Sequence, residues 1–187
     1  MGGRYTGVAI ALHWLIAALI LLNLYLGWRM GFEKGMAQFA TFQLHKSVGI
    51  TVLAFSLIRL AWRLSHRPPP YPRDQAHWER VTASAVHWTF YGLMIGMPLT
   101  GWVIVSASPL NIPTLLFRTI PLPHIGLVHD LSMATRKAIE GNVAQVHVVL
   151  AYGFAALIAL HVAAALKHQF VDHDAELSRM LPGRRTA

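Results

Sequence analysis

Histidine is the residue type whose number and placement in this chain point to chemistry. The 187-residue sequence contains 11 histidines, and a set of five lies within or at the ends of long apolar stretches: His13, His45, His87, His147 and His161. An ionisable side chain is costly inside such a stretch, so a functional role is the first interpretation to test. The alternative for any one of them is a neutral imidazole that hydrogen-bonds a neighbouring helix or lies at a water interface.

Two of these histidines share one face of the last apolar stretch. His161 follows His147 by 14 residues, which in an α-helix is about 1400° of rotation, about 40° short of four full turns. The same spacing separates the two imidazoles by about 21 Å along the helix axis. Because that distance is too large for one metal centre, the spacing predicts two centres at different heights. Each centre would be completed by a histidine from another helix.

The composition predicts the elements that must carry these residues. The chain is 55% hydrophobic and only 13% charged, whereas soluble domains carry about 25% charged residues. Its apolar residues concentrate in four stretches of roughly 23 to 25 residues, enough to cross a hydrocarbon core of about 30 Å. These stretches cover about 8–30, 42–64, 81–105 and 143–166. We therefore expect an all-α, integral membrane four-helix bundle that forms a single domain over residues 1–187.

The formal net charge of +8 is interpreted as a signal of membrane topology, and nucleic-acid binding is not expected. One side of the bundle would carry Arg4, Arg59, Arg63, Arg67, Arg73, Arg80, Lys167, Arg179, Arg184 and Arg185. The other side would carry Arg29, Lys34, Lys46, Arg118, Arg136 and Lys137, partly balanced by Glu33, Asp130 and Glu140. The more basic side is expected to be cytoplasmic.

This orientation places both termini and the tail over about 167–187 in the cytoplasm, and the loop over about 106–142 outside. Prolines at 109, 113, 121 and 123 predict an irregular start to that loop. Residues 127–139 are expected to form a short helix lying on the bilayer, which is itself the expected partner of the whole chain.

The same orientation sorts the histidines into pairs by depth. The first stretch starts inside, so His13 lies at the inner level, and the second starts outside, so His45 lies at the outer level. The fourth stretch also starts outside, which puts His147 at the outer level and His161 at the inner level. We therefore expect His13 to pair with His161, and His45 with His147. Small residues one turn away, such as Gly49, would leave space for a flat cofactor.

Imidazole pairs without other metal ligands predict haem. The chain has no cysteine, which excludes thiolate ligation, iron–sulfur clusters within this chain and covalently attached c-type haem. No carboxylate lies within the four stretches for a zinc or di-iron site or for a proton relay. We therefore expect two haem b groups, the inner iron held by His13 and His161 and the outer iron by His45 and His147. Bis-imidazole haem favours electron transfer over oxygen binding.

The residues around these histidines resemble the bacterial cytochrome b561 family, which are four-helix dihaem proteins of the inner membrane. The matching segments are Arg4-Tyr5, Ala11-Leu12-His13-Trp14-Leu15, Leu44-His45-Lys46-Ser47-Val48-Gly49-Ile50, Val86-His87-Trp88, Gly101 and Leu160-His161-Val162-Ala163-Ala164-Ala165-Leu166-Lys167-His168. The resemblance covers essentially the whole chain and is weakest in the outer loop. It implies a multi-pass protein of the bacterial inner membrane and the same four haem ligands, His13, His45, His147 and His161.

The resemblance also implies an activity, which is superoxide:ubiquinone oxidoreduction. Superoxide would be oxidised on the periplasmic side, and ubiquinone would accept the electrons. A basic mouth would raise the encounter rate of this small anion, and Lys46, Arg136 and Lys137 are the candidates for it. The alternatives are pairing of Lys46 with a haem propionate and a solvated helix surface for the other two.

Four further residues are expected to support the cofactors. His87 lies near the inner level, where no axial ligand is missing, and is expected to hydrogen-bond a propionate or a neighbouring helix, with axial ligation as the alternative. Arg4 and Arg59 would pair with propionates or lipid phosphate. The resemblance favours His168 as a quinone contact, because a histidine can donate both a hydrogen bond and a proton near neutral pH. The alternative for His168 is a solvated side chain at the interface.

Two other classes of function remain open on the sequence alone. A cytochrome b membrane-anchor subunit would share this architecture and pass electrons from a partner dehydrogenase or hydrogenase to quinone. A histidine-bearing transporter or structural four-helix protein would bind no haem. The short chain favours the stand-alone enzyme over the anchor subunit. Reduction by superoxide would separate the first two classes, and a b-type spectrum would eliminate the third.

Overall fold

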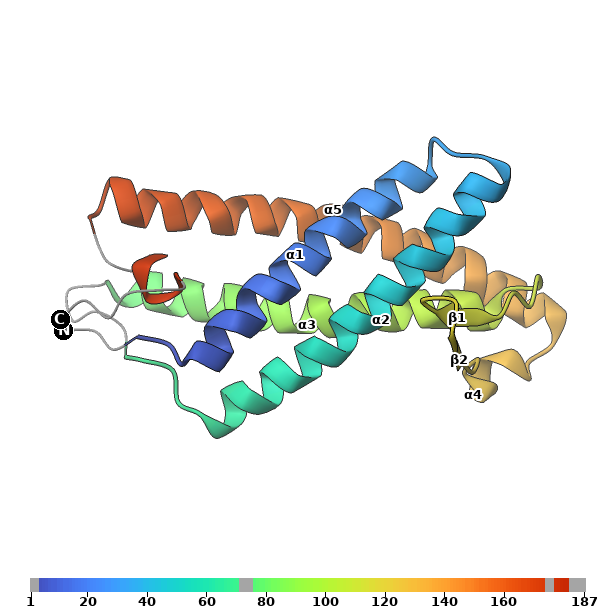
Figure 1. Ribbon diagram of the computed structural model, residues 1–187, viewed down its shortest axis with the longest axis horizontal. Coiled ribbons are helices and arrows are strands. Elements are labelled where there is room, and N and C mark those ends of the chain that lie inside the picture. Colours follow the sequence, from blue (N-terminus) through green and yellow to red (C-terminus); the bar gives the residue numbers. More distant parts are fainter. Residues whose placement is uncertain (1–3, 71–75, 174–176, 182–187) are drawn as a thin grey trace.

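The computed structural model describes residues 4–70, 76–173 and 177–181, which form an assembly of long helices (Figure 1). Four helices have the length and composition to cross a membrane: α1 (Gly7–Met30), α2 (Gly35–Ser65), α3 (His77–Ala107) and α5 (Met133–Phe170). Between α3 and α5 lie β1 (Thr114–Leu116), β2 (Ile120–Leu122) and α4 (Gly126–His129), and the short 3-10 helix η1 (Leu177–Arg179) follows α5. The predicted fold class is confirmed. Arg73, Arg184 and Arg185, which contribute to the predicted orientation, lie outside the described residues.

Local signals fix where the helices begin. The Thr6 hydroxyl caps α1 by accepting a hydrogen bond from the Ala9 N–H at 3.3 Å, and Ser132 caps α5 by accepting one from the Thr135 N–H at 3.3 Å. The expectation of a separate interfacial helix over residues 127–139 is wrong. Because Ser132 starts a helix and no proline follows to stop it, residues 133–139 continue into α5, and only α4 forms a separate short helix.

The helices pack as two antiparallel couples. α1 packs along α2, and α3 packs along α5, while α2 also contacts α3. In Figure 1 the α1–α2 couple crosses the other couple obliquely. We call the end that holds the start of α1 and η1 the tail end, and the opposite end, with β1, β2 and α4, the hairpin end. Each long helix therefore runs from one end of the bundle to the other.

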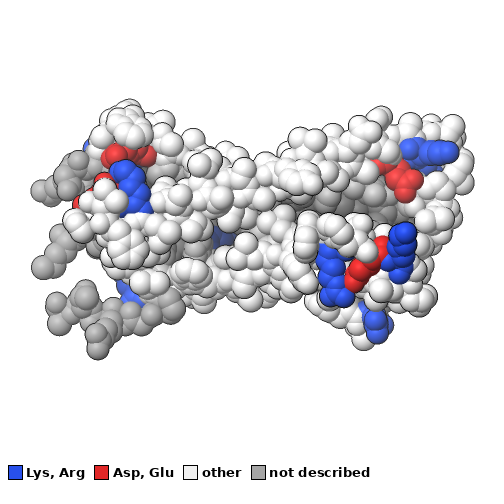
Figure 2. All heavy atoms as spheres, turned by 90° about the horizontal axis from the view of Figure 1, so that it is seen from above, with Lys and Arg blue, Asp and Glu red and all other residues white. Residues whose placement is uncertain are grey.

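The surface between the two ends is apolar. Figure 2 shows lysine, arginine, aspartate and glutamate gathered at both ends, with a middle band almost free of them on that face. Large apolar side chains of α5 between His147 and His161 are exposed, among them Val149 and Tyr152, with exposed fractions of 69% and 75%. A helix with so much exposed apolar surface is stable in lipid rather than in water. The distribution supports a bundle that spans a membrane.

The β1–β2 hairpin was not expected from the sequence. Thr114 pairs with Leu122 and Leu116 with Ile120, and the strands are connected by Phe117, Arg118 and Thr119. Phe117 and Arg118 have positive φ, 48° and 63°, as the two central residues of a type I′ turn require. Asn-Gly is the usual sequence at these two positions, so Phe117-Arg118 does not predict a turn. The positive φ of both residues means that their backbone is strained. The Phe117 N–H donates to the Ser47 hydroxyl at 3.0 Å, which fastens the turn to α2.

Arg136 ties the first turn of α5 to the end of α3. Its side chain is buried; Nε donates to the Ala107 carbonyl at 3.3 Å, and Nη2 donates to the Ser108 carbonyl at 2.5 Å and to Asn111 Oδ1 at 2.6 Å. Carbonyls at a helix C-terminus lack helical partners and carry partial negative charge. A cation placed there satisfies both needs, so these bonds hold the hairpin end together.

We predict that Arg136→Met destabilises the protein by about 2–4 kcal/mol, because it removes charge-assisted bonds and leaves buried carbonyls unpaired. The neighbouring Lys137→Met changes the same charge at an exposed position and should have little effect. Thermal unfolding of the purified variants in one detergent measures the difference. Equal midpoints for the two variants would show that the Arg136 bonds are not structural.

Candidate functional site

Four histidines of the bundle form two pairs at different heights. At the tail end, the ring centres of His13 on α1 and His161 on α5 lie 6.4 Å apart, with the ring planes at 70°. At the hairpin end, the ring centres of His45 on α2 and His147 on α5 lie 6.3 Å apart, with the planes at 76°. We call them the tail pair and the hairpin pair. α5 thus supplies one imidazole to each pair.

The spacing within each pair fits one metal ion between two imidazoles. A metal–imidazole nitrogen bond is about 2 Å long and the ring centre lies about 1 Å further on, so opposed rings have centres about 6 Å apart. Both pairs match that separation. No group of three or more histidine, aspartate or glutamate side chains suited to a metal occurs in the described part of the chain. The donor set is therefore that of an axially ligated macrocycle rather than a protein-caged ion.

The pairs bridge the more open helix interfaces. α5 packs closely along α3 but not along α1 or α2, the helices that supply the opposing histidines. Each ring of the hairpin pair also lies directly on a helix backbone. A Cβ added to Gly27 would sit 3.4 Å from Cε1 of His45, and one added to Gly101 would sit 3.5 Å from Cε1 of His147. A flat group could lie between α5 and the α1–α2 couple.

Hydrogen bonds orient both rings of the hairpin pair. His45 Nδ1 lies 3.1 Å from the carbonyl of Asn23, and His147 Nδ1 lies 2.7 Å from Oγ1 of Thr100. A carbonyl can only accept, so His45 carries its proton on Nδ1 and leaves Nε2 for a metal. No sequence pattern pointed to Asn23 or Thr100, because each contact crosses between helices.

His87 adds a third imidazole beside the tail pair. Its ring centre lies 5.9 Å from that of His161, and the planes meet at 72°. Phe90, also on α3, lies against His161 with ring centres 5.2 Å apart. The structure thus brings His87 to the level where the sequence predicted a supporting role for it.

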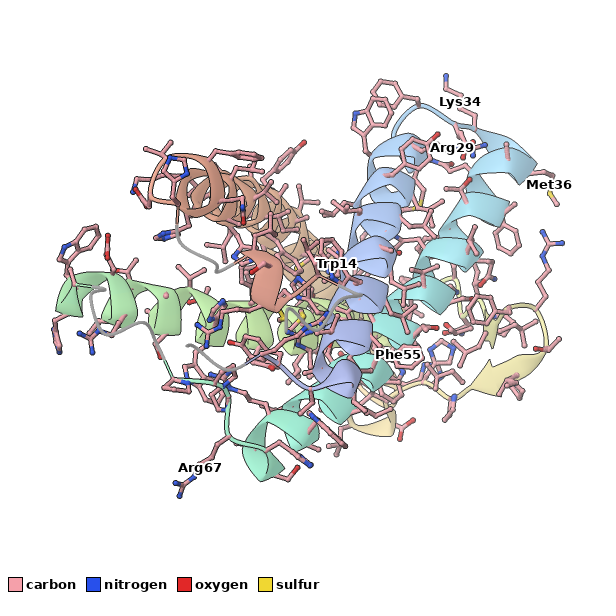
Figure 3. All side chains as sticks on the ribbon, turned by 60° about the vertical axis from the view of Figure 1, so that its left-hand side comes forward. Trp14, Arg29, Lys34, Met36, Phe55 and Arg67 are labelled. Atoms are coloured by element: carbon pink, nitrogen blue, oxygen red, sulfur yellow. The ribbon has the colours of Figure 1, made fainter. Side chains whose placement is uncertain are left out.

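A basic cavity of about 350 Å³ opens at the tail end next to the tail pair. Its lining includes four arginines, Arg4, Arg59, Arg63 and Arg67, together with Tyr5 and Tyr91. Arg59 Nη1 donates to the Ala9 carbonyl at 3.4 Å, one turn before His13. Such a lining suits anionic groups. In Figure 3 the Arg67 side chain extends away from the bundle.

The segment around η1 covers this end of the bundle. Arg4 donates to the Leu181 carbonyl, and Trp14 Nε1 donates to the Met180 carbonyl at 2.7 Å. Arg179 is buried and donates to the Pro70 carbonyl at 2.8 Å. Figure 3 shows Trp14 on α1, on the side facing this segment. Arg4, expected to bind propionate or phosphate, thus also anchors the tail.

His168 lies at the end of α5 beside a carboxylate that the sequence did not single out. Its Nδ1 is 3.1 Å from Asp172 Oδ2, and Lys167 Nζ lies 2.6 Å from the same oxygen. The Lys167 hydrogen bond, with the nearby cationic charge, holds the pKa of the Asp172 carboxyl below its usual range. The carboxylate therefore stays ionised near neutral pH and can accept a hydrogen bond from the His168 imidazole.

The three candidates for superoxide access occupy different environments. Lys46 is 9% exposed; its Nζ donates to Thr114 Oγ1 at 3.2 Å and lies 4.8 Å from the centre of the Phe42 ring. Arg136 is committed to the end of α3, and Lys137 is exposed. Only Lys46 adjoins a paired histidine in sequence, and its partners here are neutral groups.

Comparisons with known proteins agree with one another. The family described as Prokaryotic cytochrome b561 matches residues 4–183. Cytochrome b561 homolog 2 of Escherichia coli K12 is 30% identical over 181 residues, covering 95% of this chain and 91% of that protein. Probable superoxide oxidase CybB of Yersinia pestis is 28% identical over 185 residues, covering 99% of each chain. Cytochrome b561 homolog 1 of Escherichia coli K12 is 25% identical over 187 residues, covering 97% and 99%.

Proposed function

The chain belongs to the prokaryotic cytochrome b561 family of membrane electron-transfer proteins, and we propose that it carries electrons from superoxide on the periplasmic side to ubiquinone. Two superoxide ions each give up one electron and become molecular oxygen. Ubiquinone takes up the two electrons and two protons to become ubiquinol. The observation that carries the proposal is the presence of two imidazole pairs at opposite ends of an apolar bundle.

The family implies b-type haem, and we propose that the chain holds two such groups. His13 and His161 would hold one iron, and His45 and His147 the other. Ring centres 6.4 and 6.3 Å apart support this assignment, as does the Nδ1–H of His45, which leaves Nε2 for iron. When bound, haem with two axial imidazoles supplies reversible one-electron transfer.

The proposed orientation places the tail end in the cytoplasm and the hairpin end in the periplasm of a bacterial inner membrane. Basic residues support it, because positively charged segments near membrane helices favour the cytoplasmic side. The tail end carries Arg4, Arg59, Arg63, Arg67, Arg80, Lys167 and Arg179 among the described residues. At the hairpin end, basic groups are offset by acids, as in the 2.6 Å pair of Arg29 with Glu33.

Lys46 is the residue we propose to draw superoxide toward the hairpin pair. Its ammonium group lies in a mostly buried position beside His45 with only neutral contacts, so its charge is available to an anion. Arg136 and Lys137 add positive charge to the same end without the same proximity in sequence. The 28% identity to Probable superoxide oxidase CybB supports this donor over others.

Quinone is proposed to bind at the tail end near His168. The contact with Asp172 fixes the position of the His168 imidazole, a group type that can donate a hydrogen bond and a proton near neutral pH, as a quinone carbonyl requires. Arg4 and Arg59, which line the basic cavity, are proposed to bind the propionates of the nearby haem. His87 would support the same haem from α3 through a hydrogen bond.

We predict that His147→Ala loses the haem of the hairpin end and keeps the other, whereas His13→Ala does the reverse. Each substitution removes one of two axial bonds at one level only. Haem content and reduced absorbance spectra of the two purified variants, compared with wild type, measure this. Loss of the same spectral component in both variants would contradict the pairing.

We predict that Lys46→Met slows reduction by superoxide about tenfold or more, because it removes the attracting charge. Reduction by ubiquinol, which approaches from the other end, should be unchanged. Stopped-flow absorbance with each reductant measures the two rates, and substitution of the exposed Lys34, Lys34→Met, serves as a charge-matched control at the same end. Equal slowing with both reductants would remove Lys46 from the donor site. Failure of superoxide to reduce the wild type would favour an anchor subunit that receives electrons from a partner protein.

We predict that His168→Leu lowers the rate of quinone reduction at least about tenfold without loss of haem, because it removes the proton donor. Asp172→Asn should lower the rate less, because it keeps the imidazole but removes the carboxylate that orients it. Steady-state turnover with a soluble quinone analogue, between pH 6 and 9, gives both numbers. Unchanged turnover in His168→Leu would place the quinone elsewhere.

A further inference from the structure

Thr100 makes two hydrogen bonds that meet at the hairpin pair. It lies on α3, and its Oγ1 donates to the Met97 carbonyl on the same helix at 2.7 Å. The same oxygen lies 2.7 Å from Nδ1 of His147 on α5. The residue therefore connects the backbone of α3 to an imidazole of the neighbouring helix.

These two contacts fix the position of a proton. A threonine hydroxyl has one hydrogen to donate, and here the Met97 carbonyl receives it, since a carbonyl can only accept. The Met97 carbonyl is also a hydrogen-bond partner of the His147 imidazole, and it can only accept, so the imidazole carries its proton on this side. Nδ1–H then donates toward both Thr100 Oγ1, at 2.7 Å, and the Met97 carbonyl. The remaining nitrogen, Nε2, keeps its lone pair. Thr100 thus selects the form of His147 that can bind a metal through Nε2.

The hairpin pair and the tail pair differ in whether their imidazoles have a hydrogen-bond acceptor at Nδ1. His45 donates its Nδ1–H to the Asn23 carbonyl, so both rings of the hairpin pair have an acceptor at Nδ1. Among the residues that the structure describes, no comparable hydrogen bond reaches His13 or His161. The tail pair instead lies beside the basic cavity lined by Arg59 and Arg63.

We propose that Thr100 is a positioning residue that orients His147 and lowers the reduction potential of the iron at the hairpin end below that at the tail end. An acceptor at Nδ1 makes an imidazole a stronger donor, which stabilises the ferric over the ferrous state. The arginines near the tail pair act in the opposite sense, because positive charge favours the reduced state. The inference rests on the proposed haem ligation by His45 and His147, and it makes electron flow from the hairpin end to the tail end favourable.

The test compares three substitutions on α3. Thr100→Val keeps the shape of the side chain but removes the hydroxyl acceptor, leaving the Met97 carbonyl alone. Thr100→Ser keeps the hydroxyl, and Thr89→Val is the matched control. Thr89 Oγ1 likewise donates to a backbone carbonyl one turn earlier, that of Ala85 at 2.9 Å, but its side chain is exposed. Equilibrium redox titration of the purified, haem-loaded proteins resolves the two potentials.

The lower potential is expected to rise in Thr100→Val, with about a tenfold change in the ferric-to-ferrous ratio at fixed ambient potential, which is 59 mV for one electron. The higher potential should stay unchanged, and Thr100→Ser and Thr89→Val should match wild type. Unchanged potentials in Thr100→Val, or equal shifts of both, would overturn the inference. A shift of the higher potential alone would overturn the proposed order of the two sites.

A second measurement holds even if Thr100→Val binds haem poorly. In the reduced wild-type protein, nitrogen-resolved proton NMR should show two histidine Nδ1–H protons that exchange slowly with water, those of His45 and His147. Thr100→Ser should retain both, and fast exchange at His147 in wild type would refute the role of Thr100. A wild-type protein without two b-type haem signals would instead refute the proposed function, so the two failures are distinguishable.

Discussion

The facing of two imidazoles across a helix interface is the interaction on which this architecture depends. The buried core draws mainly on α1, α2 and α3, and Phe154 is its one member from α5 in the described chain. α5 packs along α3 and meets α1 and α2 chiefly through His161 and His147. Imidazoles at that depth cannot rely on water for hydrogen bonds. A ligand held between them would therefore set the position of α5 as much as apolar packing does.

Charge in this protein is confined to the ends, where individual groups have separate tasks. Arg136 binds the carbonyls at the end of α3, Arg179 holds the segment around η1, and Lys46 connects α2 to β1 through Thr114. No acidic residue lies between the two histidine levels on any of the long helices. Electron transfer through the bundle does not need a carboxylate, whereas a proton relay through its middle would need one. In the proposed function, proton uptake by quinone would then take place at one end, where His168 and Asp172 meet.

Periodicity and length were sufficient to predict the long helices and the histidine pairs. Four membrane-length helices and the proximity of His147 to His45 come from hydropathy, helical spacing and topology, whereas haem ligation itself stays a prediction. The sequence does not predict the β1–β2 hairpin, because Phe117 and Arg118 occupy turn positions that usually require Asn-Gly. The roles of Arg136 and Thr100 depend on how neighbouring helices are rotated about their axes. One-dimensional patterns do not specify that rotation, so contacts between helices had to come from the structure.

The unbroken length of α5 has a consequence for how this protein can change over evolutionary time. One continuous helix carries one histidine of each pair, so the number of residues between His147 and His161 sets the axial distance between the two levels. Inserting or deleting one residue there would swing one imidazole by about 100° relative to the other. Residues 148–160 can be substituted by other apolar residues. The number of residues in 148–160 has to stay the same. Relatives should therefore differ in this segment by substitutions and almost never by insertions or deletions.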